Sequence, residues 1–146
     1  MHTAFLSDTT ILLGEADRAA GVRLGRLLTS LGAVVFGPHA TVAGVAATVG
    51  SASSSLRRVA VLDADAEPGP VSDLVERLRA RRIPCLLRST VSRGGGHAID
   101  QIDAPVLPRT ADPRQLATVV CALATADALV VARRPPIRQA RCSLVR

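Results

Sequence analysis

The chain contains no lysine, no tryptophan and no tyrosine, and its only aromatic residues are Phe5 and Phe36. A nucleic-acid surface that stacks bases on aromatic rings is therefore not expected. No apolar run is long enough to span a bilayer, so no membrane segment is predicted. The first eight residues lack a basic region followed by a long apolar stretch, and we expect no secretory signal.

Cysteine is also scarce, with Cys85, Cys121 and Cys142 far apart in the chain. An odd, widely spaced set gives neither a disulfide framework nor the spacing of a metal site. A cytoplasmic protein in a reducing compartment fits this pattern.

The 146 residues suffice for one domain with a real core, and 48% of them are hydrophobic. All 18 basic residues are arginines, and the formal net charge is +6. Five arginines and no acid fall in Arg133–Arg146, which leaves about +1 for the rest. We expect an N-terminal extension over 1–9, a domain over 10–131 and a basic, disordered tail over 132–146. The tail alone would give DNA only non-specific, salt-sensitive affinity, so nucleic acid is not an expected partner.

The central stretch of the sequence is Val59-Ala60-Val61-Leu62-Asp63. A short apolar run bounded by charged and turn residues is typical of a strand buried on both faces, in the middle of a parallel sheet. Asp63 then lies at the carboxyl end of its strand, where open α/β sheets bind ligands. A buried carboxylate is costly without a partner, so Asp63 is expected to face a cleft or a cation.

Strand and helix patterns alternate along the rest of the chain. Strands are expected at 11–14, 33–36, 59–63, 84–87 and 104–107, and helices at 17–31, 41–49, 71–78 and 112–131. Gly94-Gly95-Gly96 disfavours a helix, so 91–103 is expected to be a flexible loop with at most a short helical piece. This alternation predicts an α/β fold, a doubly wound five-stranded parallel sheet.

Such a sheet gathers polar side chains at the carboxyl ends of its strands. The expected set is Glu15, Asp17, Asp63, Asp65, Ser89 and Arg109. Clustered carboxylates repel each other unless a divalent cation lies among them, and oxygen ligands suit Mg²⁺. A metal-bound carboxylate beside a hydroxyl and a cation can accept a phosphoryl group, because these groups neutralise the transferred oxygens.

The order and spacing of several motifs resemble the receiver domain of two-component response regulators, which has a CheY-like fold. The resemblance runs from about Thr10 to about Leu123. Its motifs are Ile11–Asp17, Leu31–Pro38, Val61–Asp63, Ile83–Leu87 and Ala104–Arg109, the last followed by Asp112-Pro113. It implies the flavodoxin-like strand order 2-1-3-4-5.

The resemblance also implies roles for single residues. Asp63 would be the phospho-acceptor, and Glu15 the first of the acidic pair that holds Mg²⁺. The backbone carbonyl of Asp65 would be a further metal ligand. Ser89 stands at the switch Ser/Thr position, and Arg109 replaces the usual lysine.

The resemblance implies a signalling protein rather than an enzyme. Its partners would be a histidine kinase or phosphotransfer protein and a downstream protein. A homodimer through the last strand and helix is left open.

Four positions depart from the receiver pattern. Ala16 stands where the family has its second metal-binding acid, and Arg109 is longer and planar where lysine is a point charge. Thr110 replaces a proline, and Val106 falls where many receivers carry Tyr or Phe. We therefore expect weakened Mg²⁺ binding and slow or absent phosphorylation.

Two classes of function remain open. One is a stand-alone receiver in a phosphorelay, and the other is a pseudo-receiver that binds partners without phosphotransfer. The residues also allow simpler roles: Glu15 as a solvated loop residue, Asp17 as a helix cap, and Arg109 as an ion-pair partner of Asp63. A haloacid-dehalogenase-type hydrolase would use the Asp63-Ala64-Asp65 spacing, but the Glu15-Ala16-Asp17 segment and the small size of the chain argue against it.

Overall fold

A computed structural model describes residues 6–50 and 57–133, with side chains as far as residue 125. The expected disorder of the tail, and most of the expected N-terminal extension, fall outside these residues.

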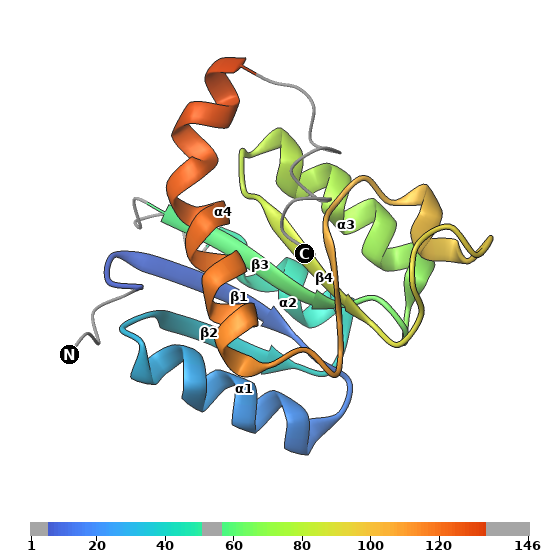
Figure 1. Cartoon of the computed structure of the whole chain (residues 1–146), viewed down its shortest axis with the longest axis horizontal. Helices are drawn as coiled ribbons and strands as arrows, with labels where there is room; N and C mark the ends of the chain where they lie inside the picture. The colour runs from blue at the N-terminus through green and yellow to red at the C-terminus, as the bar shows by residue number, and fades with distance from the viewer. Residues whose placement is uncertain (1–5, 51–56, 134–146) are drawn as a thin grey trace.

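The fold is a five-stranded, all-parallel sheet of order β2-β1-β3-β4-β5, which confirms the predicted CheY-like α/β architecture (Figure 1). The strands are β1 (Thr9–Gly14), β2 (Val34–His39), β3 (Arg57–Asp63), β4 (Cys85–Ser89) and β5 (Val106–Pro108). The helices are α1 (Arg18–Ser30), α2 (Val42–Thr48), α3 (Pro68–Ala80), the 3₁₀ helix η1 (Ala98–Gln101) and α4 (Pro113–Arg133).

The helices cover both faces of the sheet and bury a core on each (Figure 1). Leu24 and Leu28 of α1 pack with Val120 of α4 on one face. Val45 of α2 and Leu74 of α3 pack on the other. β1 and β3 lie between these layers, and Val59–Leu62 are at most 1% exposed, as expected for a strand covered on both faces.

Two helices end in the same backbone motif with different residues. After α1, Gly32 takes a positive φ of 104°, and the amide of Ala33 donates to the Leu28 carbonyl (3.2 Å). After α3, Arg82 takes a φ of 62°, and the amide of Ile83 donates to the Leu78 carbonyl (2.9 Å). Glycine is the usual residue at this left-handed position, because it lacks a Cβ.

The end of β2 differs from the prediction. The sequence placed the strand end at Phe36, before Gly37-Pro38, but β2 continues to His39. β2 is an edge strand, where the missing amide hydrogen of a proline costs no ladder bond. Gly37 has a φ of 126°, and a Cβ there would lie 2.4 Å from the Leu13 carbonyl oxygen, so only glycine fits.

Other boundaries shift for similar local reasons. α3 begins at Pro68 rather than Val71, because proline is compatible with the first helical turn. β4 begins at Cys85 and runs on to Ser89, past the expected end at Leu87. β5 spans Val106–Pro108 rather than 104–107, and it lies at the sheet edge, where prolines such as Pro105 and Pro108 are tolerated.

The glycine-rich segment is a loop with one short 3₁₀ helix, as expected, but internal hydrogen bonds hold it. The Arg93 guanidinium donates to the carbonyls of Ile99 (2.9 Å) and Ile102 (2.6 Å), and also to that of Ala104. The Asp100 carboxylate accepts from the amides of Gly94 (2.7 Å), Gly96 (2.8 Å) and His97 (3.2 Å). These backbone hydrogen bonds, that from Gly94 foremost, lower the pKa of Asp100.

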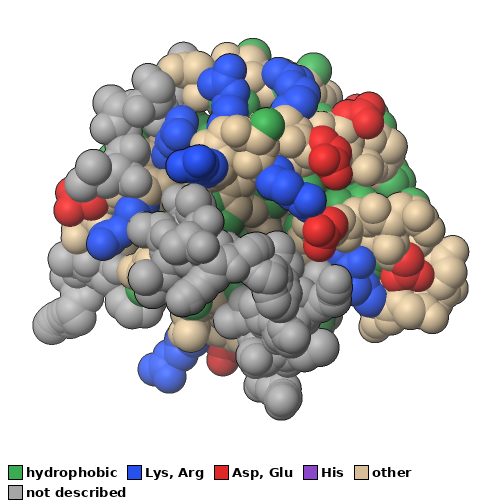
Figure 2. Space-filling view, turned by 90° about the horizontal axis from the view of Figure 1, so that it is seen from above, with side chains coloured by type: hydrophobic (Ala, Val, Ile, Leu, Met, Phe, Trp, Pro, Cys, Tyr) green, Lys and Arg blue, Asp and Glu red, His purple; other side chains and the backbone are tan. Residues whose placement is uncertain are grey.

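The two ends of the parallel strands carry different residues. The candidate site lies at the carboxyl ends, while arginines flank the amino ends of β3 and β4. Figure 2 shows arginine side chains in blue spread over the face that it draws, with most of the acidic side chains in red to the right. Within residues 6–50 and 57–133, no helix is long and apolar enough to cross a membrane.

Candidate functional site

Glu15 follows β1 and is only 2% exposed, so the alternative of a solvated loop residue is wrong. Its Oε1 accepts a hydrogen bond from Nη1 of Arg88 (2.7 Å). Its Oε2 accepts from Nη2 of Arg109 and from the amide of Asp17 (3.1 Å). Both carboxylate oxygens are thus held by guanidinium groups.

Asp63 ends β3 and faces the same cluster. Its Oδ2 accepts from the Ala16 amide (3.1 Å), and its Oδ1 accepts from the Asp65 amide (2.9 Å). Nη1 of Arg109 lies 3.3 Å from Oδ1. The ion pair between Arg109 and Asp63 that the sequence allowed is present, and Arg109 also joins Asp63 to Glu15.

The side chains of Asp65 and Ser89 form a separate hydrogen-bonded link between the β3–α3 loop and the end of β4. The Ser89 hydroxyl donates to Oδ1 of Asp65 (2.6 Å) and accepts from the Val91 amide (3.0 Å). Oδ2 of Asp65 accepts from the Thr90 amide (3.0 Å). The buried Ser89 hydroxyl is thus bonded to Asp65 and not to Asp63. Because the Asp65 carboxylate is occupied, it is poorly placed as the acid/base of the hydrolase alternative.

Asp17 belongs to the helix rather than to the cluster. Its Oδ1 accepts from the Ala20 amide (3.1 Å) and caps α1, as predicted. Ala16 contributes its backbone amide to Asp63, and its methyl group cannot ligate a metal.

Arg88 is the principal residue that the sequence analysis missed. It lies directly opposite Asp63 in the β3–β4 register, and its side chain is 14% exposed. Burial lowers the pKa of Arg88, partly offset by the nearby Glu15 carboxylate. Burial also opposes ionisation of Arg109, but its hydrogen bond to Glu15 and the neighbouring carboxylates raise its pKa overall. The available signal was a charged residue directly after the apolar run Cys85-Leu86-Leu87.

The central cluster is electrically balanced by its own side chains. Two carboxylates, Glu15 and Asp63, lie among two guanidinium groups, Arg88 and Arg109. All four side chains are at most 19% exposed, so solvent screens these charges weakly. The repulsion that suggested a divalent cation at this edge is therefore relieved by arginine.

The resemblance implies a Mg²⁺ site at Glu15, Asp63 and the backbone carbonyl of Asp65. Mg²⁺ requires a near-octahedral shell of oxygen ligands. Both oxygens of Glu15 already accept from guanidinium groups, and position 16 offers no side-chain oxygen. In the part of the chain that the structure describes, no group of three or more His, Cys, Asp or Glu side chains is arranged to hold a metal ion. The residues present do not fit Mg²⁺.

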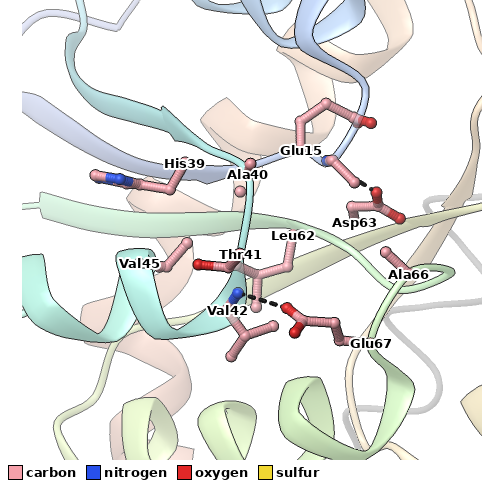
Figure 3. A pocket seen from close by; sticks show the side chains of 12 residues that line it. Glu15, His39, Ala40, Thr41, Val42, Val45, Leu62, Asp63, Ala66 and Glu67 are labelled. Atoms are coloured by element: carbon pink, nitrogen blue, oxygen red, sulfur yellow. Dashed lines mark hydrogen bonds between the residues drawn. The ribbon is translucent and has the colours of Figure 1, made fainter.

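A small pocket that is partly open to solvent lies beside Asp63. Figure 3 shows Asp63 and Glu67 on one side of Leu62 and Thr41 and Val42 on the other, and all five line the pocket. Oε1 of Glu67 accepts from the Val42 amide (2.7 Å) and ties the β3–α3 loop to the start of α2. No sequence motif indicated this contact.

Comparisons with known proteins add support for the fold alone. No family model matches the chain, and no curated protein matches it. One solved chain that is similar in structure is described as a yeast Spc42 trimeric coiled-coil segment, amino acids 181–211, fused to another structure. It is 17% identical, with 95% of this chain and 93% of that chain covered and a TM-score of 0.68. At this identity the likeness concerns architecture and carries no function.

Proposed function

We propose that this chain is a pseudo-receiver, a protein-interaction module with the receiver fold that works without phosphotransfer. One observation carries the proposal: the buried Glu15 carboxylate is bound on both oxygens by Arg88 and Arg109. In a phosphorylating receiver, the resemblance assigns this carboxylate to Mg²⁺.

The chemistry of Asp63 supports the same conclusion. Transfer of a phosphoryl group to a carboxylate needs positive charge close to the transferred oxygens. Both oxygens of Asp63 accept backbone hydrogen bonds, and Arg109 is shared with Glu15. The hydroxyl of Ser89 is bonded to Asp65 instead of facing Asp63. The groups expected to assist transfer are thus engaged elsewhere.

A second candidate is a stand-alone receiver that accepts a phosphoryl group from a histidine kinase or phosphotransfer protein. Its support is the position of Asp63 among the residues that line the open pocket (Figure 3). In both cases we propose a cytoplasmic protein that signals through protein contact, including a homodimer through β5 and α4.

The experiment that separates the two candidates is incubation with acetyl phosphate and Mg²⁺, followed by intact mass measurement. The pseudo-receiver predicts no phosphoryl adduct on the native chain. Asp63→Asn is the matched control, since it keeps the shape of the side chain and removes the acceptor. An adduct on the native chain that disappears in Asp63→Asn would establish the phosphorylating receiver instead.

A further inference from the structure

Five arginines surround the amino ends of two neighbouring strands, opposite the candidate site. Arg57 and Arg58 begin β3, Arg81 and Arg82 precede β4, and Arg77 lies in the last turn of α3. Since β3 and β4 are parallel neighbours, these residues share one edge of the sheet, which we call the basic edge.

The basic edge carries positive charges that no described acidic side chain pairs with directly. None of its five arginines forms an ion pair with another described residue. Arg79, on the same helix, is different, because it pairs with Asp103 at 3.1 Å. Four of the five are exposed and Arg58 is half-buried. Like charges held together repel each other, so this grouping lowers stability unless an anionic partner binds.

Arg82 gives a second, independent observation. It has the left-handed φ of 62° at the end of α3, where the equivalent motif after α1 uses Gly32. Apart from Arg82, Asp8 is the only described non-glycine residue with a positive φ. A side chain at this position strains the backbone, and strain of this kind is often retained where the side chain has a function. Here the retained side chain adds charge to the basic edge.

We infer that the basic edge binds an acidic segment of a protein partner. This inference rests on the proposed function as an interaction module, and it names the chemistry of the partner. Guanidinium groups bind carboxylates through paired hydrogen bonds. Nucleic acid is the weaker candidate, since Phe36 is partly buried against the core and no described aromatic side chain lies on this edge to stack with bases.

The test measures binding of a fluorescein-labelled oligoglutamate peptide to the full chain by anisotropy at low salt. The double variant Arg81→Gln/Arg82→Gly is expected to bind about tenfold more weakly, with a shallower salt dependence. The matched control is Arg18→Gln/Arg114→Gln, which removes the same charge from exposed positions at the opposite edge. It should keep nearly native affinity. Equal losses in both variants would overturn the inference, because they would show attraction by net charge alone.

Two further measurements separate a binding role of Arg82 from a structural one, and a protein partner from nucleic acid. Arg82→Gly alone should raise the unfolding midpoint by about 2–4 °C and still weaken peptide binding. If Arg82 had only a structural role, the substitution would raise the midpoint without weakening peptide binding. A lowered midpoint would contradict the strain argument. Tighter binding of a duplex DNA of equal charge, lost in the same double variant, would assign the basic edge to nucleic acid and overturn the protein assignment. A phosphoryl adduct at Asp63 would refute the pseudo-receiver but leave these affinities unchanged, so the two proposals fail separately.

Discussion

Because Arg88 donates a hydrogen bond to the buried Glu15 carboxylate, we predict that these two side chains are strongly coupled in their effect on stability. Replacing Glu15 with Gln keeps the shape of the side chain but leaves two largely buried guanidinium groups short of a carboxylate. In either orientation, the NH₂ group of the introduced glutamine would also face an N–H donor, because donors lie at both carboxylate oxygens of Glu15. Removing one member of a buried ion pair costs about 3 kcal/mol. We therefore expect an unfolding midpoint about 6–12 °C lower.

Arg88→Met should cost less, about 2 kcal/mol, because Glu15 keeps Arg109 and the Asp17 amide as donors. The double variant should cost about 3 kcal/mol rather than the sum, since removal of Arg88 relieves the donor conflict with Gln at position 15. The coupling is thus about 2 kcal/mol, within the range for residues in contact.

The assay is urea unfolding of the native chain, both single variants and the double variant. The exposed pair Arg79–Asp103 is the control, with side chains 45% and 49% exposed. The cycle of Arg79→Gln and Asp103→Asn should give a coupling below about 1 kcal/mol. The coupling is refuted if the loss of unfolding free energy in the double variant equals the sum of the losses in the Glu15 and Arg88 single variants to within about 0.5 kcal/mol.

Three further predictions test other parts of the structure. Burial raises the pKa of Cys85 to about 12, so its thiol should resist iodoacetamide at neutral pH in the folded chain and react in urea, as measured by peptide mass spectrometry; rapid labelling of the folded chain would contradict its burial. Hydrogen bonds from Gly94 and other amides lower the pKa of Asp100, so its contribution to stability is present above the unfolded pKa and is lost as the pH falls through the lower folded pKa. Protection of the Gly94 amide against hydrogen exchange should therefore fall in acid, and Asp100→Asn should abolish that dependence; an unchanged acid response would refute this origin. Ala16→Asp should gain Mg²⁺ affinity by calorimetry only when Arg88→Ala is also present, because Arg88 otherwise occupies Glu15, and a gain in Ala16→Asp alone would contradict the occupied-donor argument.

The sequence predicted the sheet because its strands carry strong local signals. Val59–Asp63 is apolar, short and bounded by charged residues, and only a central parallel strand buries such a run on both faces. The Asp17 cap was predictable for the same reason, since an aspartate directly before a helical pattern satisfies the first free amides.

The candidate site was harder to predict because its decisive contacts join distant residues. Arg88 donates to Glu15 across 73 positions of sequence, and no local pattern encodes that pairing. The apolar pattern predicts a strand end at Leu87, whereas β4 runs on to Ser89 and places Arg88 opposite Asp63. The burial of Glu15 likewise depends on two arginines from separate strand ends.

The central claim is that arginine, and not Mg²⁺, satisfies the buried carboxylate at the end of β1. The most direct test is a Mg²⁺ titration of the isotope-labelled protein, followed through the amide resonances of Ala16, Asp17 and Asp65. Two of these amides donate to Asp63 and one to Glu15, so a bound metal would shift all three. If arginine satisfies this carboxylate, no saturable shift appears in the millimolar range, either in the native chain or in Asp63→Asn. Saturable shifts that Asp63→Asn abolishes would contradict this claim and restore the metal-dependent receiver.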